Sequence, residues 1–305
     1  MFDCYLDDHM RILITGATGL LGKALIENRS NDDEIVATYM GDYTMDDYEG
    51  IKYLKLDILD LEGTLCLFKD FKPEIVIHTA SIGSPDYAEK HRKKTKDVNV
   101  MGTQRVLSIC EQYSAKFIYI SSNGIYDGER APYGEDSRAE PINYYGEVKL
   151  QGETVTKQAK IQHAIVRPIL MYGWNHPFER SNIVTQAILK LQKNEAMHAY
   201  DDVYANPLFN YSCARAIWEI IKKEKYDVFN IAGAERVSIY QLLGKVAEIF
   251  DLDANLIKPV QQGFFNELVK RPKDTSFKTE KMEKELGLKP LSLGEGLRLM
   301  KEIQK

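Results

Sequence analysis

Three side chains in the middle of the chain have types and spacing that could support proton transfer. Tyr145 and Lys149 are four residues apart, so on a helix they would share one face. A free tyrosine titrates at about 10, and a nearby ammonium lowers that value. Tyr145 could then act as a general acid or base, while the hydroxyl of Ser122 holds a substrate oxygen. Tyr144 is a competitor, but Val148 stands four residues after it and supplies no cation.

A glycine-rich turn near the start of the chain could hold a dinucleotide. It follows the apolar run 12–14 and precedes a helical pattern, and its glycines are spaced GxxGxxG. In such a turn Gly16 allows the tight bend, Gly19 lets the backbone approach phosphate, and Gly22 lets the helix pack on the strand. The helix N-terminus supplies free N–H groups. A plain helix-opening turn is the alternative, and the position after the first strand favours phosphate. The candidate contacts are Gly16, Thr18, Gly19, Leu20, Leu21 and Gly22.

Two further strand ends bear on the choice of cofactor. Asp57 could accept a hydrogen bond from an adenine amino group or cap the helix that starts near Leu61, and the spacing leaves both open. The second strand ends near Tyr39 without a carboxylate where a ribose diol is usually held. A missing acid favours NADP(H) slightly over NAD(H).

The fourth strand is followed by small residues. Thr79, Ala80 and Ser81 would allow the backbone to lie against a flat cofactor. His78, which precedes them, is predicted to be packed in the interior and not to be catalytic.

These residues need a scaffold of alternating strands and helices to bring them together. The pattern predicts strands at 11–15, 34–40, 51–57, 74–79, 116–121, 163–168 and 228–232, and helices at 20–28, 61–71, 98–113 and 144–159. Repeated units of this kind predict an α/β fold with a doubly wound parallel sheet, a Rossmann fold. Ligands bind such sheets beyond the carboxyl ends of the strands, where the candidate residues stand.

The second half of the chain has a looser pattern. Helices are predicted at 183–192, 213–222, 239–250, 279–286 and 293–303, which indicates a smaller, mostly helical substrate lobe. We therefore expect an N-terminal extension at 1–9 and a dinucleotide-binding domain at 10–170, to which 210–235 returns. The substrate lobe would comprise 171–209 and 236–305.

Composition excludes several classes of protein. A net charge of −5 argues against nucleic-acid binding, and the most basic run, 91–96, is predicted to be a solvated loop or helix end. Four cysteines are scattered without a CxxC pair, which predicts reduced thiols, no metal site and a cytoplasmic location. No apolar run approaches the ~20 residues of a membrane span.

The motifs together resemble the extended short-chain dehydrogenase/reductase superfamily: TGATGLLG, Asp57, HTAS, Asn99, the serine loop and YGEVK. The stretch 122–153 is similar to the dTDP-4-dehydrorhamnose reductase branch. Members of that branch read STDYVFDG, then PYxE, then PxxxYGxxKxxGE. The motifs IVRP at 165–168, Asp202 with Asn206-Pro207, and Arg271-Pro272 extend the resemblance, which runs from Met10 to the end.

The resemblance implies a role for each matched position. Ser122, Tyr145 and Lys149 would be the catalytic triad, Asp57 and Ile58 would flank the adenine, and Asn99 would support the active-site helix. The full cofactor set would be Gly16, Thr18, Gly19, Leu20, Leu21, Gly22, Tyr39, Asp57, Ile58, Thr79, Ala80, Ser81, Asn99, Tyr145 and Lys149. The substrate set would be Ser122, Asn123, Arg167, Trp174 and Arg271. The chain departs from the branch at the threonine, acid and aromatic, which are Ser122, Asn123 and Gly124 here.

The resemblance implies an NAD(P)H-dependent reductase of a nucleotide-linked keto-sugar, with Tyr145 as proton donor. One alternative is a nucleotide-sugar 4-epimerase or dehydratase on the same fold. Another is a cofactor-binding regulatory subunit without turnover; such subunits usually lose the tyrosine–lysine pair, which is intact here. Family habit implies a homodimer through the helices at 98–113 and 144–159.

Overall fold

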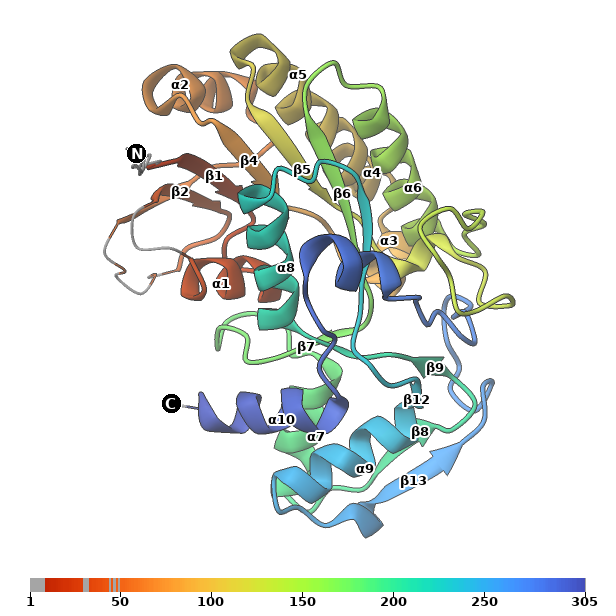
Figure 1. Cartoon of the computed structure of the whole chain (residues 1–305). Coiled ribbons are helices and arrows are strands. Elements are labelled where there is room, and N and C mark those ends of the chain that lie inside the picture. Colours follow the sequence, from red (N-terminus) through yellow and green to blue (C-terminus); the bar gives the residue numbers. More distant parts are fainter. Residues whose placement is uncertain (1–8, 30–32, 44, 46–47, 49, 305) are drawn as a thin grey trace.

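The computed structural model describes residues 9–29, 33–43, 45, 48 and 50–304. Except for His9, the predicted N-terminal extension lies outside the described residues. Figure 1 shows a central sheet between two layers of helices, with a second group of elements beside it that includes α7, α9 and α10.

The central sheet has seven strands, and every pair of neighbours is parallel. Their order is β11-β6-β5-β4-β1-β2-β3. The strands are β1 (Arg11–Thr15), β2 (Glu34–Tyr39), β3 (Ile51–Lys55), β4 (Ile75–His78), β5 (Lys116–Ile120), β6 (His163–Pro168) and β11 (Val228–Ile231). The direction in which strands are added reverses between β1 and β4, and such a switch point is where doubly wound sheets bind ligands. The predicted fold class is confirmed.

Both faces of the sheet are covered because alternate strand residues point to opposite sides. Ile12 and Ile14 pack with α1 (Leu20–Glu27) and α8 (Asn210–Lys222) on one face. Leu13 packs with α2 (Leu61–Phe71) and α5 (Thr103–Tyr113) on the other, where α6 (Tyr144–Lys157) lies against α5. Each fully buried aliphatic side chain contributes about 1.5–3 kcal/mol.

The connection from β4 to β5 is more helical than the sequence predicted. It contains α3 (Pro85–Lys90), α4 (Arg92–Lys96) and the π-helix η1 (Asp97–Gly102) before α5 begins. The basic run predicted as a loop or helix end therefore forms α4. The helix predicted at 98–113 is divided, and its first turn is η1.

A second hydrophobic cluster forms around α7 (Ile183–Gln192), α9 (Ile239–Ile249), α10 (Leu293–Glu302) and the parallel pair β8 (Met197–Tyr200) and β13 (Ile257–Val260). We call these five elements the smaller lobe. Capping boxes at Ser238 and Ser292 begin α9 and α10. The remaining elements are short: η2 (Asn123–Ile125), β7 (Met171–Tyr172), β9 (Tyr204–Ala205), β10 (Leu208–Phe209), β12 (Val237–Ser238), η3 (Ala254–Leu256) and η4 (Met282–Leu286).

The chain passes between the sheet and the smaller lobe more than once. It leaves the sheet after β6, forms α7 and β8, and returns for α8 and β11, which pairs with β6. It then leaves again for α9, β13 and α10. The smaller lobe is thus built from two separate stretches of sequence (Figure 1).

Gly22 should not tolerate a side chain. A Cβ there would lie 2.5 Å from the carbonyl oxygen of Gly16 and 2.7 Å from Cα of Ala17. We expect Gly22→Ala to lower the free energy of unfolding by about 1–3 kcal/mol, because the helix must move off the turn. Gly244→Ala is the matched control, since nothing lies within 4 Å of a Cβ at Gly244. Chemical denaturation measures both, and equal effects would contradict this account of the turn.

Candidate active site

Ser122 stands just beyond the carboxyl end of β5, and its hydroxyl is held by local hydrogen bonds. Its Oγ accepts a hydrogen bond from the backbone N–H of Gly124 (3.1 Å) and donates one to Oδ1 of Asn123 (3.3 Å). Asn123 in turn donates from Nδ2 to Oγ1 of Thr275 (2.7 Å). Local hydrogen bonds therefore hold the hydroxyl of Ser122 in place. Asn123 connects the serine loop to the segment that contains Thr275.

Tyr145 is brought to Ser122 by the first turn of α6. Asn143 caps that helix by accepting a hydrogen bond from the N–H of Gly146 (3.0 Å). A Cβ placed on Gly124 would lie 3.1 Å from Cε1 of Tyr145 and 3.5 Å from Oγ of Ser122. The tyrosine ring and the serine hydroxyl thus meet over Gly124.

Gly146 makes this approach possible. A Cβ on Gly146 would lie 2.1 Å from the carbonyl oxygen of Gly124, so the start of α6 rests directly on the serine loop. The sequence reasoning did not assign this role to Gly124 or Gly146. Gly146, directly after Tyr145, was the residue in the sequence that could have indicated this close approach.

The expectation that Lys149 lowers the pKa of Tyr145 is corrected by the structure. Burial raises the pKa of Tyr145, and the hydrogen bond with Ser122 and the charge of Arg180 act in the opposite direction. Lys149 instead directs its ammonium to the carbonyl oxygen of Ile120, at 2.7 Å.

Lys149 is buried between α6 and the sheet. Its exposed fraction is 2%, and its Nζ lies 5.1 Å from the ring centroid of Tyr119. Burial lowers the pKa of Lys149 to about 8, and the negative charge of Glu153 opposes this effect. A buried ammonium with a titration midpoint near neutrality is typical of functional sites.

His78 is a structural residue, as expected from the sequence. Its Nδ1 lies 2.9 Å from Oγ1 of Thr15 and its Nε2 lies 3.1 Å from Oγ1 of Thr103. Burial, helped by the charge of Lys149, lowers the pKa of His78 to about 3. The imidazole is therefore neutral and bridges two strands and a helix.

The glycine-rich turn has the geometry that a pyrophosphate requires. Gly16 has φ of +72°, and a Cβ there would lie 2.7 Å from the backbone of Ala80. Thr79 donates from Oγ1 to the carbonyl oxygens of Thr15 (2.6 Å) and Gly16 (3.1 Å), which ties this turn to the end of β4. Gly19 is the N-cap of α1 and offers no side-chain cap, so the first N–H groups of α1 remain available to an anion. These residues fit a dinucleotide.

The ends of the first three strands carry other predicted cofactor residues. Asp57 accepts a hydrogen bond from the N–H of Leu59 (2.9 Å), whereas Asp60 caps α2, so the alternative that Asp57 is the N-cap is wrong. Ile58 is buried, and Tyr39 packs edge-to-face on Tyr53. Thr18 and Leu21 are buried, and Leu20 is partly exposed.

Asn99 and Ser81 belong to the segments that follow β4. Asn99, in η1, accepts from the N–H of Ile82 (2.7 Å) and donates to its carbonyl oxygen (3.0 Å). It therefore holds the loop after β4 in place, and η1 packs against α6. Ser81 is exposed beside this loop.

Two predicted substrate residues bond to partners within the fold: Arg167 is buried and Trp174 is partly exposed. Arg167 is 3% exposed, and its guanidinium bonds to the carboxylate of Glu153 and the hydroxyl of Tyr126. Trp174 donates from Nε1 to the carbonyl oxygen of Met300 (2.7 Å) and packs with the smaller lobe. The enclosure of Arg167 argues against a direct contact with substrate, whereas the assignment of Trp174 stays a prediction.

Arg271 connects its own segment of the chain, near the C-terminus, to helix α3. Its guanidinium forms an ion pair with Asp86 of α3 (2.6 Å) and lies 3.9 Å from Glu267. Its side chain is 28% exposed. It therefore remains accessible beside α3.

The segment after β7 contains Arg180, whose effect on the site the sequence did not reveal. Phe178 stacks on Tyr43 of the loop after β2, with ring centroids 4.0 Å apart, and on His176 at 5.0 Å. Arg180 follows two residues later, and its charge opposes the rise in the pKa of Tyr145 that burial causes. No motif or spacing marked Arg180, because it reaches Tyr145 only through the tertiary fold.

The opposite end of the sheet carries none of the predicted site residues. A cavity of about 1280 Å³ lies there, and its lining includes Arg11, Glu74, Lys116 and Glu224.

Within the described ranges, no helix is both long and apolar enough to cross a membrane.

Comparison with known proteins identifies the family and supports the fold. Residues 10–304 match the model of the RmlD substrate binding domain. A dTDP-4-dehydrorhamnose reductase from Bacillus anthracis, solved in complex with NADP, is similar with a TM-score of 0.85 and 26% identity, over 96% of this chain and 99% of that one.

Curated relatives carry two different names. The chain is 25% identical to methionine adenosyltransferase 2 subunit beta of Danio rerio, over 90% of this chain and 84% of the relative. It is 24% identical to dTDP-4-dehydrorhamnose reductase of Aggregatibacter actinomycetemcomitans, over 92% of this chain and 94% of the relative. The family resemblance carried by the motifs is confirmed, and the chain belongs to the RmlD substrate binding domain family.

Proposed function

We propose that this protein is an NAD(P)H-dependent reductase of a nucleotide-linked keto-sugar. The observation that supports this most directly is the meeting of Tyr145 and Ser122 over Gly124, at the carboxyl end of β5. The glycine-rich turn lies at the carboxyl end of β1, on the same edge of the sheet. The similarity of the whole chain to the NADP-bound reductase supports the same proposal.

The proposed mechanism divides the work between the cofactor and the protein. When bound, the cofactor supplies a hydride to the carbonyl carbon of the sugar. Tyr145 donates its phenolic proton to the carbonyl oxygen, while the hydroxyl of Ser122 donates a hydrogen bond to the same oxygen. Both donors are in place before the charge develops, which lowers the barrier. Lys149 is buried, and its ammonium would hold the ribose hydroxyls of the bound cofactor, so its role does not require it to lower the pKa of Tyr145.

The direct test combines the purified protein with NADPH or NADH and a panel of 4-keto-6-deoxy sugar nucleotides. We expect loss of the absorbance of the reduced cofactor, with a reduced sugar identified by mass spectrometry. Tight cofactor binding without oxidation across the panel would contradict the proposal. Bound NAD that cycles without net change would favour an epimerase.

We infer a preference for NADP(H) from the end of β2. Asp42, the carboxylate closest in sequence to that end, pairs with Lys55 of β3. This ion pair lies at the surface, so the inference rests on the end of β2 itself, where Tyr39 stands and no carboxylate does. Dissociation constants for NADPH and NADH, measured by fluorescence, test this; tighter binding of NADH would contradict it.

Turnover should fall at alkaline pH. Lys149 has a pKa lowered to about 8 by burial, so its ammonium is present below that pH and is lost above it. Burial raises the pKa of Tyr145, so its phenol remains protonated over the same range. We expect kcat/KM to decline with a midpoint of about 8, and Lys149→Arg to remove that decline because arginine stays charged. The pH–rate profiles of both proteins are the measurement.

A second candidate is a regulatory subunit that binds the cofactor without turnover. The similarity to methionine adenosyltransferase 2 subunit beta favours it. In that case wild type and Tyr145→Phe would be equally inactive in every assay, and a methionine adenosyltransferase would bind the protein and change its activity on binding.

The homodimer and the cytoplasmic location stay predictions. Met101 of η1 and Tyr113 of α5 are exposed large side chains on the helices expected to pair. Sedimentation equilibrium would detect the dimer, and a monomer at all concentrations would contradict it.

A further inference from the structure

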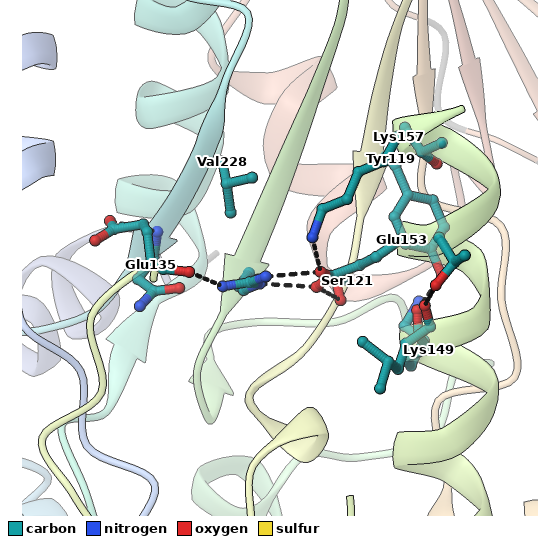
Figure 2. Close-up of polar contacts among 12 residues, drawn as sticks. Tyr119, Ser121, Glu135, Lys149, Glu153, Lys157 and Val228 are labelled. Atoms are coloured by element: carbon teal, nitrogen blue, oxygen red, sulfur yellow. Dashed lines mark hydrogen bonds and ion pairs between the residues drawn. The ribbon is translucent and has the colours of Figure 1, made fainter. Parts of the chain in front are cut away.

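A fully paired buried carboxylate lies one helical turn beyond Lys149. Glu153 is 0% exposed, and its Oε1 accepts hydrogen bonds from Oγ of Ser121 (2.6 Å) and Nε of Arg167 (2.7 Å). Its Oε2 accepts from Nη2 of Arg167 (2.7 Å), and the ammonium of Lys157 lies 3.5 Å away. Figure 2 shows this carboxylate facing the end of β5, with Lys157 approaching from the same helix.

The hydrogen bonds of this cluster join three elements that carry or adjoin the candidate site: α6, β6 and the residues just after β5. Ser121 directly precedes Ser122, and its own N–H donates to the carbonyl oxygen of Val166 in β6 (2.7 Å). Arg167 continues β6 and also donates to the carbonyl oxygen of Glu135 (2.9 Å). Glu153 therefore fixes the axial position of α6 against the ends of β5 and β6.

The same face of α6 packs tightly on β5 between Lys149 and Glu153. A Cβ on Gly152 would lie 2.1 Å from the hydroxyl oxygen of Tyr119. That hydroxyl donates a hydrogen bond to the carbonyl oxygen of Lys149 (3.4 Å). Figure 2 shows Tyr119 beside Lys149. A shift of α6 would therefore move Tyr145 and Lys149 together relative to Ser122.

The charge of Glu153 also bears on Lys149. The titratable groups around the Lys149 ammonium are His78 of β4, Tyr119 of β5, and Tyr145 and Glu153 of α6, with Arg167 of β6 on the far side of Glu153. His78 is neutral, and burial raises the pKa of both tyrosines. Burial would also raise the pKa of Glu153, but the hydrogen bonds and charge of Arg167, with Ser121 and Lys157, hold it below its ordinary value. Of these four groups, Glu153 alone is an anion.

We propose that Glu153 is a positioning residue, which holds α6 and the serine loop in register and keeps a negative charge beside the Lys149 ammonium. This role rests on the proposed function for its effect on turnover, because it acts through Lys149 and does not touch the reacting atoms. Its effect on Lys149 itself does not depend on any substrate.

The test follows the titration of Lys149 directly. Protein grown with ¹³C-lysine gives a Cε signal for Lys149 by NMR, assigned by its loss in Lys149→Arg. In wild type we expect a midpoint of about 8. In Glu153→Gln, which keeps the shape and removes the charge, we expect the midpoint about one pH unit or more lower. Glu153→Asp keeps the charge and should restore a midpoint close to that of wild type.

Two further variants separate this role from folding alone. Glu153→Gln combined with Arg167→Met removes both charges, leaves no unpaired ion and should lower the midpoint in the same way. Val246→Ala, in the core of the smaller lobe, should destabilise the protein without moving the Lys149 midpoint. An unchanged midpoint in a folded Glu153→Gln would overturn the proposal. Failure of both Glu153→Gln proteins to fold would also overturn it, since only a folding role would remain.

The outcome is distinguishable from failure of the proposed function. If the wild type oxidises no cofactor with any sugar but Glu153→Gln lowers the Lys149 midpoint, the reductase proposal fails and the role of Glu153 stands. If the wild type is a reductase, Glu153→Gln should move the alkaline decline of kcat/KM to lower pH by the same amount as the NMR midpoint.

Discussion

Replacing Tyr145 with phenylalanine is expected to lower kcat about 10³-fold with the preferred keto-sugar, since general acid catalysis contributes 10²–10⁴-fold. The ring would still pack over Gly124, so the shape of the site is kept and only the proton donor is lost. The dissociation constant of the cofactor should be unchanged. Steady-state kinetics and fluorescence titration measure the two quantities.

Tyr144 provides the matched control for that substitution. It is the neighbouring residue on α6, but its hydroxyl donates to the carbonyl oxygen of Arg92 (3.0 Å) and is directed away from the serine loop. Tyr144→Phe should retain nearly full activity. Equal kcat for Tyr145→Phe and wild type would remove the phenol from the mechanism.

Arg167→Met should cause the largest loss of stability, about 3–5 kcal/mol, because it leaves the buried carboxylate of Glu153 without its main partner. Arg167 is enclosed, so we expect this loss without a change in KM for the sugar, at temperatures where the variant stays folded. The midpoint of chemical denaturation gives the first quantity and steady-state kinetics the second.

An exposed arginine calibrates this effect. Arg138 pairs with Glu140 at 3.0 Å, and its side chain is 80% exposed, so Arg138→Met should cost less than about 1 kcal/mol. Glu153→Gln combined with Arg167→Met should recover much of the stability lost in Arg167→Met. A raised KM in Arg167→Met with unchanged stability would return Arg167 to the substrate site.

The strands of the central sheet could be predicted because each one corresponds to a short local run of apolar residues. Short apolar runs such as 11–15 alternate with helical patterns, and a parallel sheet follows from that alternation. The short strands β7, β9, β10 and β12 have two residues each and carry no periodicity to detect. The π-helix η1 was also missed, because its hydrogen bonding differs from that of an α-helix while its side-chain pattern does not.

The candidate site was predictable only as far as its residues follow strand ends or share a helix face. Ser122 and Tyr145 met these conditions, and the structure brings them together. Arg167 was assigned to the substrate from a motif. A cation near the end of a strand can pair either with an anionic substrate or with a carboxylate inside the protein. Its partner Glu153 comes from a different element, so the spacing could not decide between the two. Arg180 acts on Tyr145 through its charge from the segment after β7, and no local sequence pattern indicates such an effect.

The return of the chain to the sheet has a practical consequence for dissecting the molecule. A fragment ending at residue 170 would lack β11, so β6 would become a bare sheet edge open to aggregation. It would also lack α8, whose Tyr211 bonds to Glu27 of α1 (2.6 Å) and whose Asn210 bonds to the carbonyl oxygen of Leu20 (3.0 Å). A fragment that is to keep the seven-stranded sheet intact must therefore extend beyond β11 and include α8.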